Sequence, residues 1–240
     1  MLEAGTGQAV ETRMNAVVIL AGDFRATPAI ERVLREADLV VAADGGAHHL
    51  ENLEITPGLL VGDLDSIAGE RRAELDSRGV EIVRRPEDKD ATDAELALLA
   101  ALDRGATAVT ILGGRGGPRA DHEAANLLLL AHPRLAAVDA RFLTATTEVR
   151  AFGPGDHTCA VESGETISLA PITANVRGVT LAGVRWPLAA VDLELGSTYT
   201  VSNRATEPEV ALRIVDGVVL FFRDLSGDGT DPAADRTEMP

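Results

Sequence analysis

The amino-acid sequence predicts an α/β protein: an N-terminal doubly wound, Rossmann-like domain with a parallel sheet, followed by a small C-terminal all-β sandwich domain. Three observations support this prediction. The 240 residues are 45% hydrophobic, which is enough for a proper core. Up to about residue 146, continuous apolar runs alternate with helical patterns, whereas from 147 to 223 short strand patterns follow one another without convincing helices. The predicted domains are therefore 15–146 and 147–223.

The first half contains six apolar runs that are continuous rather than alternating. Such runs are typical of strands in a parallel sheet that is covered on both faces. The predicted strands are 16–22, 39–44, 59–63, 80–83, 108–114 and 140–145. Helical patterns lie between them at 27–37, 68–79 and 91–105. This order of strands and helices is typical of a doubly wound domain.

The second half predicts a small antiparallel sandwich or barrel. Its strand candidates are 147–152, 157–161, 166–172, 176–186, 198–203, 209–215 and 217–222. Asp216-Gly217, between the last two candidates, predicts a hairpin turn. The polar segments 1–14 and 224–240 carry too few apolar residues to pack, so we predict that both are disordered tails.

Charge and composition exclude several classes of partner. The formal net charge of −16 argues against nucleic acids and anionic membranes, which are polyanions. A nucleotide substrate stays possible, because a bound divalent cation can reverse the local sign of the charge. Cys159 is the single cysteine, so no disulfide forms within the chain. The N-terminal residues lack a signal-peptide pattern, and no apolar run approaches the roughly 20 residues of a membrane span, so the predicted location is the cytoplasm.

Aspartates follow four of the predicted strands. The loops are 43–47, 62–66, 88–93 and 113–122. In an open α/β sheet, ligands bind outside the carboxyl ends of the strands. Clustered carboxylates repel one another unless a cation neutralises them, and hard oxygen ligands around a nucleotide suit Mg²⁺. Glycines in these loops let backbone N–H groups approach phosphates. Together the loops predict a site for Mg–ATP.

Each loop taken singly has a structural alternative. Asp44-Gly45-Gly46 can be a strand-to-helix turn. Asp63-x-Asp65 can be a surface turn, or the nucleophile motif of an aspartate-dependent phosphatase. Asp90, Thr92 and Asp93 can cap the helix that follows, with Thr92 and Glu95 as a capping box. The glycine loop is not a Walker P-loop, because no Gly-Lys-Ser/Thr follows it.

The histidines and the lysine also have two interpretations. His122 can be a packed helix residue or a ligand, and we predict that His48 and His49 face solvent on a helix. Lys89 is the single lysine of the chain and stands between two aspartates. A compact ammonium group differs chemically from a guanidinium, so a lysine at this one position favours a specific role for Lys89. The alternative is that this lysine was retained by chance.

The motifs together resemble the thiamine pyrophosphokinase family. They are Ala43-Asp44-Gly45-Gly46-Ala47, Gly62-Asp63-Leu64-Asp65-Ser66, Lys89-Asp90-Ala91-Thr92-Asp93 and Arg119-Ala120-Asp121-His122, with Asn126 four residues further on. In the β half, Trp186 and Ser202-Asn203 also match, and the resemblance covers about residues 16 to 223. It implies a homodimer that transfers pyrophosphate from ATP to the hydroxyl of thiamine, giving thiamine diphosphate and AMP.

The resemblance also implies roles for individual residues. Mg²⁺ would be held by Asp63, Asp65 and Asp93. ATP would be bound by Asp44, Gly45, Gly46, Lys89, Asp90, Thr92, Arg119 and His122. Thiamine would be bound by Trp186, Ser202 and Asn203. Asp121 joins the three metal ligands in the catalytic set, and either Asp93 or Asp121 would take the proton of the hydroxyl.

This sequence departs from the family pattern at two positions. Leu64 stands where phenylalanine is common, and Pro118 stands where a glycine is expected, which removes an N–H donor. Three other functions stay open on the residues alone. They are a pyrophosphokinase for another small alcohol such as a hydroxymethyl pterin, an Mg²⁺-dependent phosphohydrolase, and a non-catalytic sensor of nucleotides or thiamine phosphates.

Overall fold

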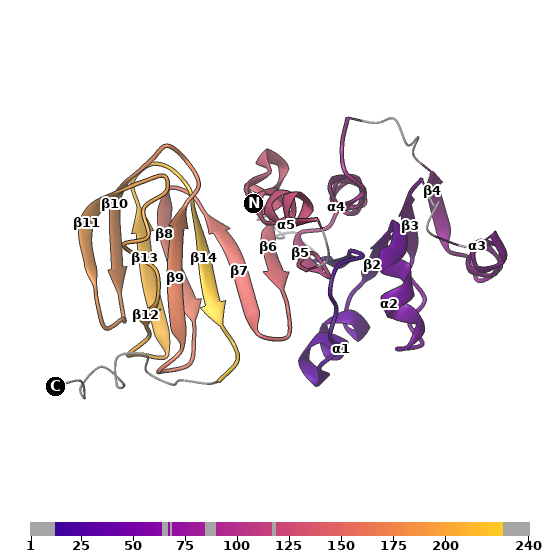
Figure 1. The fold of residues 1–240 in the computed structure, drawn as a ribbon, viewed down its shortest axis with the longest axis horizontal. Coiled ribbons are helices and arrows are strands. Elements are labelled where there is room, and N and C mark those ends of the chain that lie inside the picture. Colours follow the sequence, from indigo (N-terminus) through magenta and orange to yellow (C-terminus); the bar gives the residue numbers. More distant parts are fainter. Residues whose placement is uncertain (1–12, 64–66, 68, 85–89, 117–118, 228–240) are drawn as a thin grey trace, which may run out of the picture.

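The protein consists of an α/β part and a β part that lie side by side (Figure 1). The computed structural model describes residues 13–63, 67, 69–84, 90–116 and 119–227. Leu64, Asp65, Lys89 and Pro118, which the sequence singled out, lie outside the described residues. Both parts share a ten-stranded sheet with the order β12-β9-β14-β7-β6-β5-β1-β2-β3-β4. This architecture confirms the predicted fold class.

The parallel half of the sheet matches the predicted strands. Its strands are β1 (Asn15–Ile19), β2 (Leu39–Ala43), β3 (Leu59–Gly62), β4 (Glu81–Arg84), β5 (Ala108–Leu112) and β6 (Asp139–Leu143). β1 pairs in parallel with both β2 and β5, so the strand order reverses between β1 and β5. Ligands of doubly wound sheets bind at such a reversal.

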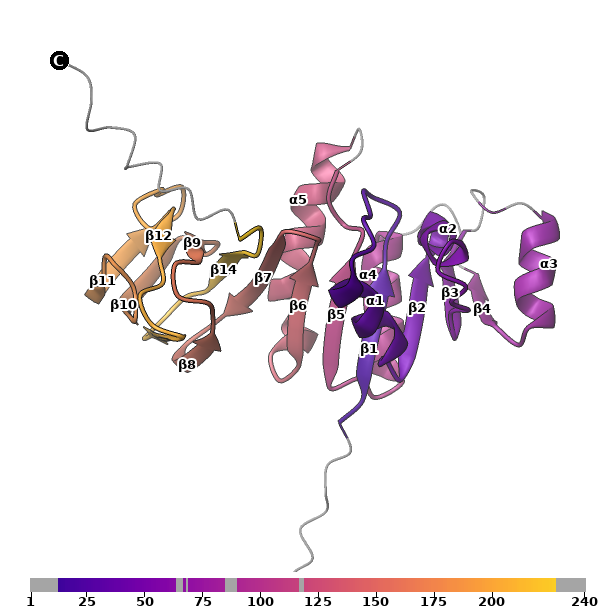
Figure 2. The ribbon, with the colours of Figure 1, turned by 90° about the horizontal axis from the view of Figure 1, so that it is seen from below.

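Helices cover both faces of these parallel strands (Figure 2). The helices are α1 (Pro28–Arg35), α2 (Ala47–Glu51), α3 (Gly69–Ser77), α4 (Asp93–Asp103) and α5 (Ala120–Leu128), with 3₁₀ turns η1 (Asp44–Gly46), η2 (Leu129–Ala131) and η3 (Pro133–Leu135). Successive side chains of a strand point to opposite faces. Accordingly Val17 and Ile19 join the core under α1, α2 and α3, while Ala16 and Val18 join the core under α4.

Helices α1 and α4 begin at local caps that the sequence supplies. Thr27 accepts a hydrogen bond from the Ile30 N–H at 3.3 Å, ahead of Pro28 in the first turn of α1. Thr92 accepts one from the Glu95 N–H at 3.2 Å and so starts α4. These caps satisfy N–H groups that have no partner inside the helix. The cap on α4 also fixes the position of Asp93, the first residue of that helix.

The β part is a sandwich, and one of its two sheets is the continuation of the parallel sheet. The strands are β7 (Thr147–Phe152), β8 (Gly155–Ala160), β9 (Thr166–Pro171), β10 (Asn175–Ala182), β11 (Leu188–Glu194), β12 (Asn203–Arg204), β13 (Glu209–Ile214) and β14 (Val219–Asp224). β7, β14, β9 and β12 extend the ten-stranded sheet, and the second sheet has the order β11-β10-β13-β8. An apolar core fills the space between the two sheets.

The structure corrects three predictions in the β part. β11 was missed, because its alanines and acidic residues give a weak strand pattern. The candidate at 198–203 is mostly turn, and only Asn203 belongs to a strand. Asp216-Gly217 does not close a hairpin, since β13 pairs with β10 and β8 in one sheet while β14 pairs with β7 and β9 in the other. The turn carries the chain from one sheet to the other.

The ends of the described chain also differ from prediction. Met14, assigned to a disordered tail, accepts hydrogen bonds from the Thr107 and Ala108 N–H groups at 3.0 and 3.1 Å. Arg13 forms an ion pair with Asp139 at 2.7 Å. At the other end Asp224 is the last residue of β14, paired with Thr147. Among the described helices, none is long and apolar enough to cross a membrane.

Candidate active site

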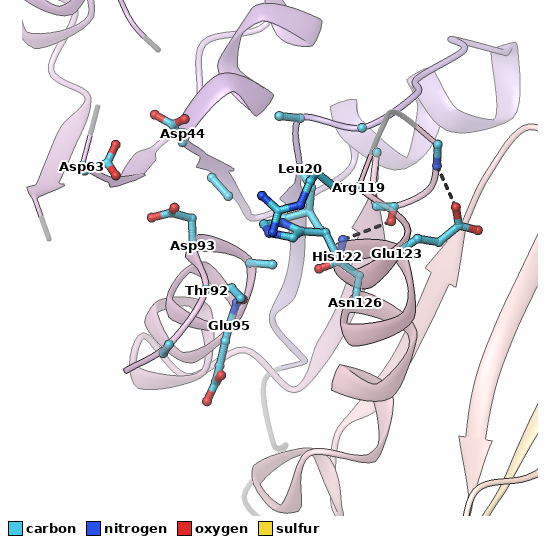
Figure 3. Close-up of a pocket in the computed structure, with 18 of the residues that line it drawn as sticks. Leu20, Asp44, Asp63, Thr92, Asp93, Glu95, Arg119, His122, Glu123 and Asn126 are labelled. Carbon is cyan, nitrogen blue, oxygen red and sulfur yellow. Dashed lines mark hydrogen bonds between the residues drawn. The ribbon is translucent and has the colours of Figure 1, made fainter. Parts of the chain in front are cut away.

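A cavity of about 810 Å³ opens where the parallel strands end. Its walls come from the ends of β1, β2, β3 and β5 and from the first turns of α4 and α5 (Figure 3). Lining residues that the sequence had singled out are Asp44, Asp63, Asp90, Thr92, Asp93, Arg119, His122 and Asn126. The tertiary structure therefore brings residues from all four predicted loops into one cavity.

Three aspartates gather at one end of this cavity. The carboxylates of Asp44, Asp63 and Asp93 lie around a common space in Figure 3. The backbone at Gly62 approaches two of them, since a methyl group there would lie 3.1 Å from Asp44 Cβ and 3.2 Å from Asp93 Oδ1. Each aspartate comes from a different element: Asp44 follows β2, Asp63 follows β3 and Asp93 opens α4.

Asp44 has two unusual features in this cluster. Its Oδ1 is buried and has no hydrogen-bond partner among the described residues, and its backbone has a left-handed φ of 42°. A buried oxygen without a partner is costly, and so is left-handed backbone at a residue other than glycine. A cation or a donor group in the cavity would satisfy the Asp44 oxygen.

The donor set fits Mg²⁺. Hard carboxylate oxygens are its preferred protein ligands, and it usually takes one or two of them together with water and phosphate oxygens. No group of three potential ligand side chains with metal-binding geometry occurs within the described ranges, and Asp65, the remaining member of the predicted set, falls outside them. A magnesium ion bound here would take its remaining ligands from water and phosphate oxygens.

The opposite wall is formed by backbone of the β1 and β5 loops. The Gly22 N–H donates to the Gly113 carbonyl at 2.7 Å, and the Asp23 N–H donates to the Arg115 carbonyl at 2.7 Å. Asn126, buried in α5, donates its side-chain N–H to the Gly114 carbonyl at 3.0 Å. These hydrogen bonds join the two loops and tie them to α5.

Glu123 is a residue of this wall that the sequence analysis missed. It accepts hydrogen bonds from the Gly116 N–H at 3.1 Å and from Arg115 Nε at 3.0 Å. The hydrogen bond from the Gly116 N–H and, to a smaller extent, that from Arg115 hold the pKa of Glu123 below its ordinary value. No motif in the sequence pointed to Glu123, because its contact with Gly116 forms only when the chain folds.

Arg119 and Asp121 form a pair at the rim. Their two hydrogen bonds measure 2.9 and 2.7 Å, and both side chains are exposed. Arg119 lines the cavity, whereas Asp121 is not among its lining residues. The hydrogen bonds from Arg119 hold the pKa of Asp121 far below its ordinary value. The Asp121 carboxylate is thus engaged by Arg119 outside the lining of the cavity.

The glycines of the first motif lie behind the cavity. Gly45 and Gly46 are buried and belong to η1. A methyl group on Gly46 would lie 2.2 Å from the Ile19 carbonyl oxygen, so glycine is required there for packing against β1. Their predicted contact with ATP stays a prediction.

The two neighbouring histidines of α2 differ, and one corrects our expectation. The side chain of His48 is half exposed and pairs with Glu51 at 3.4 Å. His49 was predicted to face solvent, but it is half-buried, and its Nε2 lies 2.9 Å from the carbonyl oxygen of Gly22. Helical periodicity alone did not show that the β1 loop folds over this side of α2.

The residues predicted to bind thiamine lie in the β part. Trp186 is 51% exposed, and the Arg185 guanidinium lies 4.8 Å from the centre of its ring. Asn203 accepts from the Trp186 N–H at 3.1 Å and donates to the Trp186 carbonyl at 2.7 Å. The Asn203 side chain therefore fixes the Trp186 loop. Ser202 has a left-handed φ of 65°, and its N–H donates to Ser168 at 2.9 Å.

The doubly wound sheet and its acidic, glycine-walled cavity define the class of this protein as a nucleotide-binding α/β enzyme joined to a β domain. Comparison with known proteins gives the family. Residues 30–141 match the catalytic domain of thiamin pyrophosphokinase, and residues 157–219 match its vitamin B1 binding domain. The chain belongs to the thiamin pyrophosphokinase family, and its activity is the synthesis of thiamine diphosphate from thiamine and ATP.

Individual relatives align with this chain over most of their length. A thiamine pyrophosphokinase of Bacillus subtilis (strain 168) is 27% identical over 207 residues, which are 86% of this chain and 96% of the relative. The crystal structure of thiamine pyrophosphokinase from Bacillus subtilis covers 88% of this chain and 99% of its own, with 25% identity and a TM-score of 0.78. A thiamin pyrophosphokinase family protein from Enterococcus faecalis covers 88% of this chain and 98% of its own, with 27% identity and a TM-score of 0.75.

Proposed function

We propose that this enzyme binds Mg–ATP in the cavity at the sheet reversal and transfers its terminal pyrophosphate in one step to the thiamine hydroxyl, releasing AMP. The observation that carries the proposal is the meeting of Asp44, Asp63 and Asp93, with a buried Asp44 oxygen that has no hydrogen-bond partner in the described part of the chain. Such a cluster is costly unless a cation with its phosphates occupies it.

The bound Mg–ATP would extend across the cavity. Asp63 and Asp93, together with Asp65, would hold Mg²⁺, with Asp44 nearby. The bound cation would neutralise charge on the phosphates. Arg119 and His122 line the other end and suit the remaining phosphate charge and the nucleoside. Lys89 keeps its predicted role beside the triphosphate.

The reaction needs in-line geometry and one proton acceptor. The thiamine oxygen attacks the β-phosphorus, and the bond from that phosphorus to the oxygen bridging the α- and β-phosphates breaks. AMP then leaves with the electron pair on its phosphate. The hydroxyl proton goes to a carboxylate. Of the two candidates, Asp93 lines the cavity, whereas Asp121 is paired with Arg119 outside its lining. We therefore assign the proton to Asp93, through a carboxylate oxygen that would not be bound to the cation.

We further propose that the active form is a homodimer in which Trp186 contacts thiamine. Trp186, Tyr199 and Val201 are large apolar side chains that are 51%, 70% and 50% exposed, and Asn203, two residues after Val201, is hydrogen-bonded to the Trp186 backbone. Large apolar side chains in adjacent loops are what a second subunit or a ligand would cover. Light scattering after gel filtration tests the dimer, and a monomeric active enzyme would contradict it. The predicted cytoplasmic location stays a prediction.

One assay tests the proposed reaction. The enzyme is incubated with Mg–ATP and either thiamine or a hydroxymethyl pterin, and the nucleotide product is identified. We expect AMP with thiamine alone. ADP as the product would indicate a kinase, and phosphate released without an acceptor would indicate a hydrolase. Tight binding of both substrates without turnover would indicate a sensor.

A further inference from the structure

The β1 loop is held against the β5 loop on one side. Leu20, Ala21 and Gly22 line the large cavity. The Leu20 and Gly22 N–H groups donate to carbonyls of Leu112 and Gly113 at 2.9 and 2.7 Å. A methyl group on Gly22 would lie 2.5 Å from the Arg115 carbonyl oxygen, so the two backbones are in close contact. These contacts use the N–H side of Gly22 and leave its carbonyl to another partner.

That partner is His49 of α2. Its Nε2 lies 2.9 Å from the Gly22 carbonyl oxygen. Because a carbonyl oxygen can only accept, the proton of this hydrogen bond resides on Nε2. The His49 ring also packs beside the Phe24 ring, with 5.0 Å between the ring centres and 31° between their planes. His49 therefore contacts the β1 loop through one hydrogen bond and one ring contact.

The location of α2 gives this hydrogen bond a consequence for the site. α2 follows directly on η1, which begins with Asp44. The chain from Asp44 to His49 is thus a short, partly buried connection between the aspartate cluster and the opposite wall of the cavity. The hydrogen bond from His49 fixes the spacing between the carboxylates and the β1 loop.

We propose that His49 is a positioning residue for the nucleotide, which holds the Gly22 loop at the distance that a bound triphosphate requires. The inference rests on the proposed binding of Mg–ATP in this cavity. Without the Nε2 donor, the Gly22 carbonyl would lose this hydrogen bond. Binding of ATP would then have to order the loop, which would weaken the affinity for ATP. Thiamine, proposed to bind at Trp186 in the β part, would be unaffected.

Three variants separate the hydrogen bond from simple packing. His49→Phe keeps an aromatic ring beside Phe24 but removes the donor. His49→Gln keeps an N–H donor at a similar reach but removes the ring. His48→Phe makes the same chemical change at the adjacent position, whose side chain pairs with Glu51 and does not line the cavity. All three retain side-chain volume on a short surface helix, so the fold should persist.

The measurements are calorimetric titration with Mg–ATP and the steady-state KM for each substrate. Loss of one neutral hydrogen bond predicts about five- to tenfold weaker ATP binding for His49→Phe. His49→Gln and His48→Phe should bind ATP as the wild type does, to within about twofold. The thiamine KM should stay unchanged in all three variants.

Two results would overturn the proposal while the proposed function stands. One is wild-type ATP affinity in His49→Phe. The other is equal weakening in His49→Phe and His49→Gln, which would assign the role of His49 to general packing. A wild-type protein that does not bind Mg–ATP would instead overturn the proposed function, and the role of His49 with it.

Discussion

At the scale of single residues, the aspartate cluster should act in the reaction rather than stabilise the fold. We expect Asp63→Asn to lower turnover at least tenfold, because it removes a charge that would hold the cation (on the order of 1.4 kcal/mol in the barrier). The melting temperature of the metal-free variant should be unchanged or higher, since one of three neighbouring negative charges is gone.

The control for Asp63→Asn is Asp76→Asn, an exposed position on α3 outside the cavity, which should leave both properties unchanged. Turnover and thermal unfolding are measured in parallel. Normal activity of Asp63→Asn at saturating Mg²⁺ would contradict a role in holding the metal.

Trp186 offers a second test at this scale. If Trp186 contacts thiamine, stacking and cation–π contacts would contribute on the order of 1–2 kcal/mol. Trp186→Ala should therefore raise the thiamine KM several-fold and leave the ATP KM nearly unchanged. Because the side chain is half exposed, the loss of stability should be small. A variant with an unchanged thiamine KM would remove Trp186 from the acceptor site.

At the scale of elements, a row of charged residues joins three strands of the ten-stranded sheet, β6, β7 and β14. Glu148 on β7 is 5% exposed and accepts from Arg150 at 2.9 Å, Arg141 on β6 at 3.2 Å and Arg223 on β14 at 3.5 Å. Arg223 also pairs with Glu165, next to β9. Glu148→Gln removes the carboxylate partner of Arg141, whereas Arg150 keeps Asp139 and Arg223 keeps Glu165. The substitution should therefore lower the free energy of unfolding by about 2 kcal/mol, the contribution of a hydrogen bond to a charged group.

The pH dependence of this effect has a definite sign. Burial opposes ionisation of Glu148, but Arg150, Arg141 and Arg223 outweigh it and lower its pKa. A carboxyl group with a lowered folded pKa stabilises the protein above its unfolded pKa of about 4.3, and that stability is lost as the pH falls through the folded value. The stability difference between wild type and Glu148→Gln should therefore be largest near neutral pH and shrink below about pH 4.

Urea unfolding at several pH values measures both effects. Asp156→Asn is a suitable control, because its ion pair with Arg213 is exposed on both sides. Exposed pairs contribute about 0–1 kcal/mol, so the control should change little. Equal losses in the two variants would show that the Glu148 network does not join the strands in the way we describe.

At the scale of the whole molecule, the continuous sheet predicts cooperative unfolding of both parts. One apolar core contains Val109 of the α/β part together with Val149 and Leu220 of the β part. The single tryptophan reports on the β part, whereas circular dichroism at helical wavelengths reports on the α/β part. The two signals should give coincident urea transitions. Separate midpoints would show that the halves unfold independently despite sharing a sheet.

The sequence by itself determined the fold class and the loops of the site. Continuous apolar runs indicate buried parallel strands, because burial on both faces leaves no polar positions. Ligands of open α/β sheets bind outside the carboxyl ends of the strands, so the loops that follow these runs are the expected site. For the same reason the loops that carry Asp44, Asp63 and Asp93 could be chosen before any contact was known, whereas the roles of the single residues came from the family resemblance. These signals are local, since each consists of residues in one strand and in the loop that follows it.

The tertiary structure alone decided contacts between distant segments. A turn signal at Asp216-Gly217 shows where the chain reverses, but the two cores decide which sheet each flanking strand joins. The role of Asn203 in fixing Trp186, and of His49 in fixing Gly22, also depends on segments 17 and 27 residues apart. Hydrogen-bond partners at such separations in the sequence are decided by packing. A buried polar group needs a hydrogen bond, and only the folded structure determines which group lies within reach.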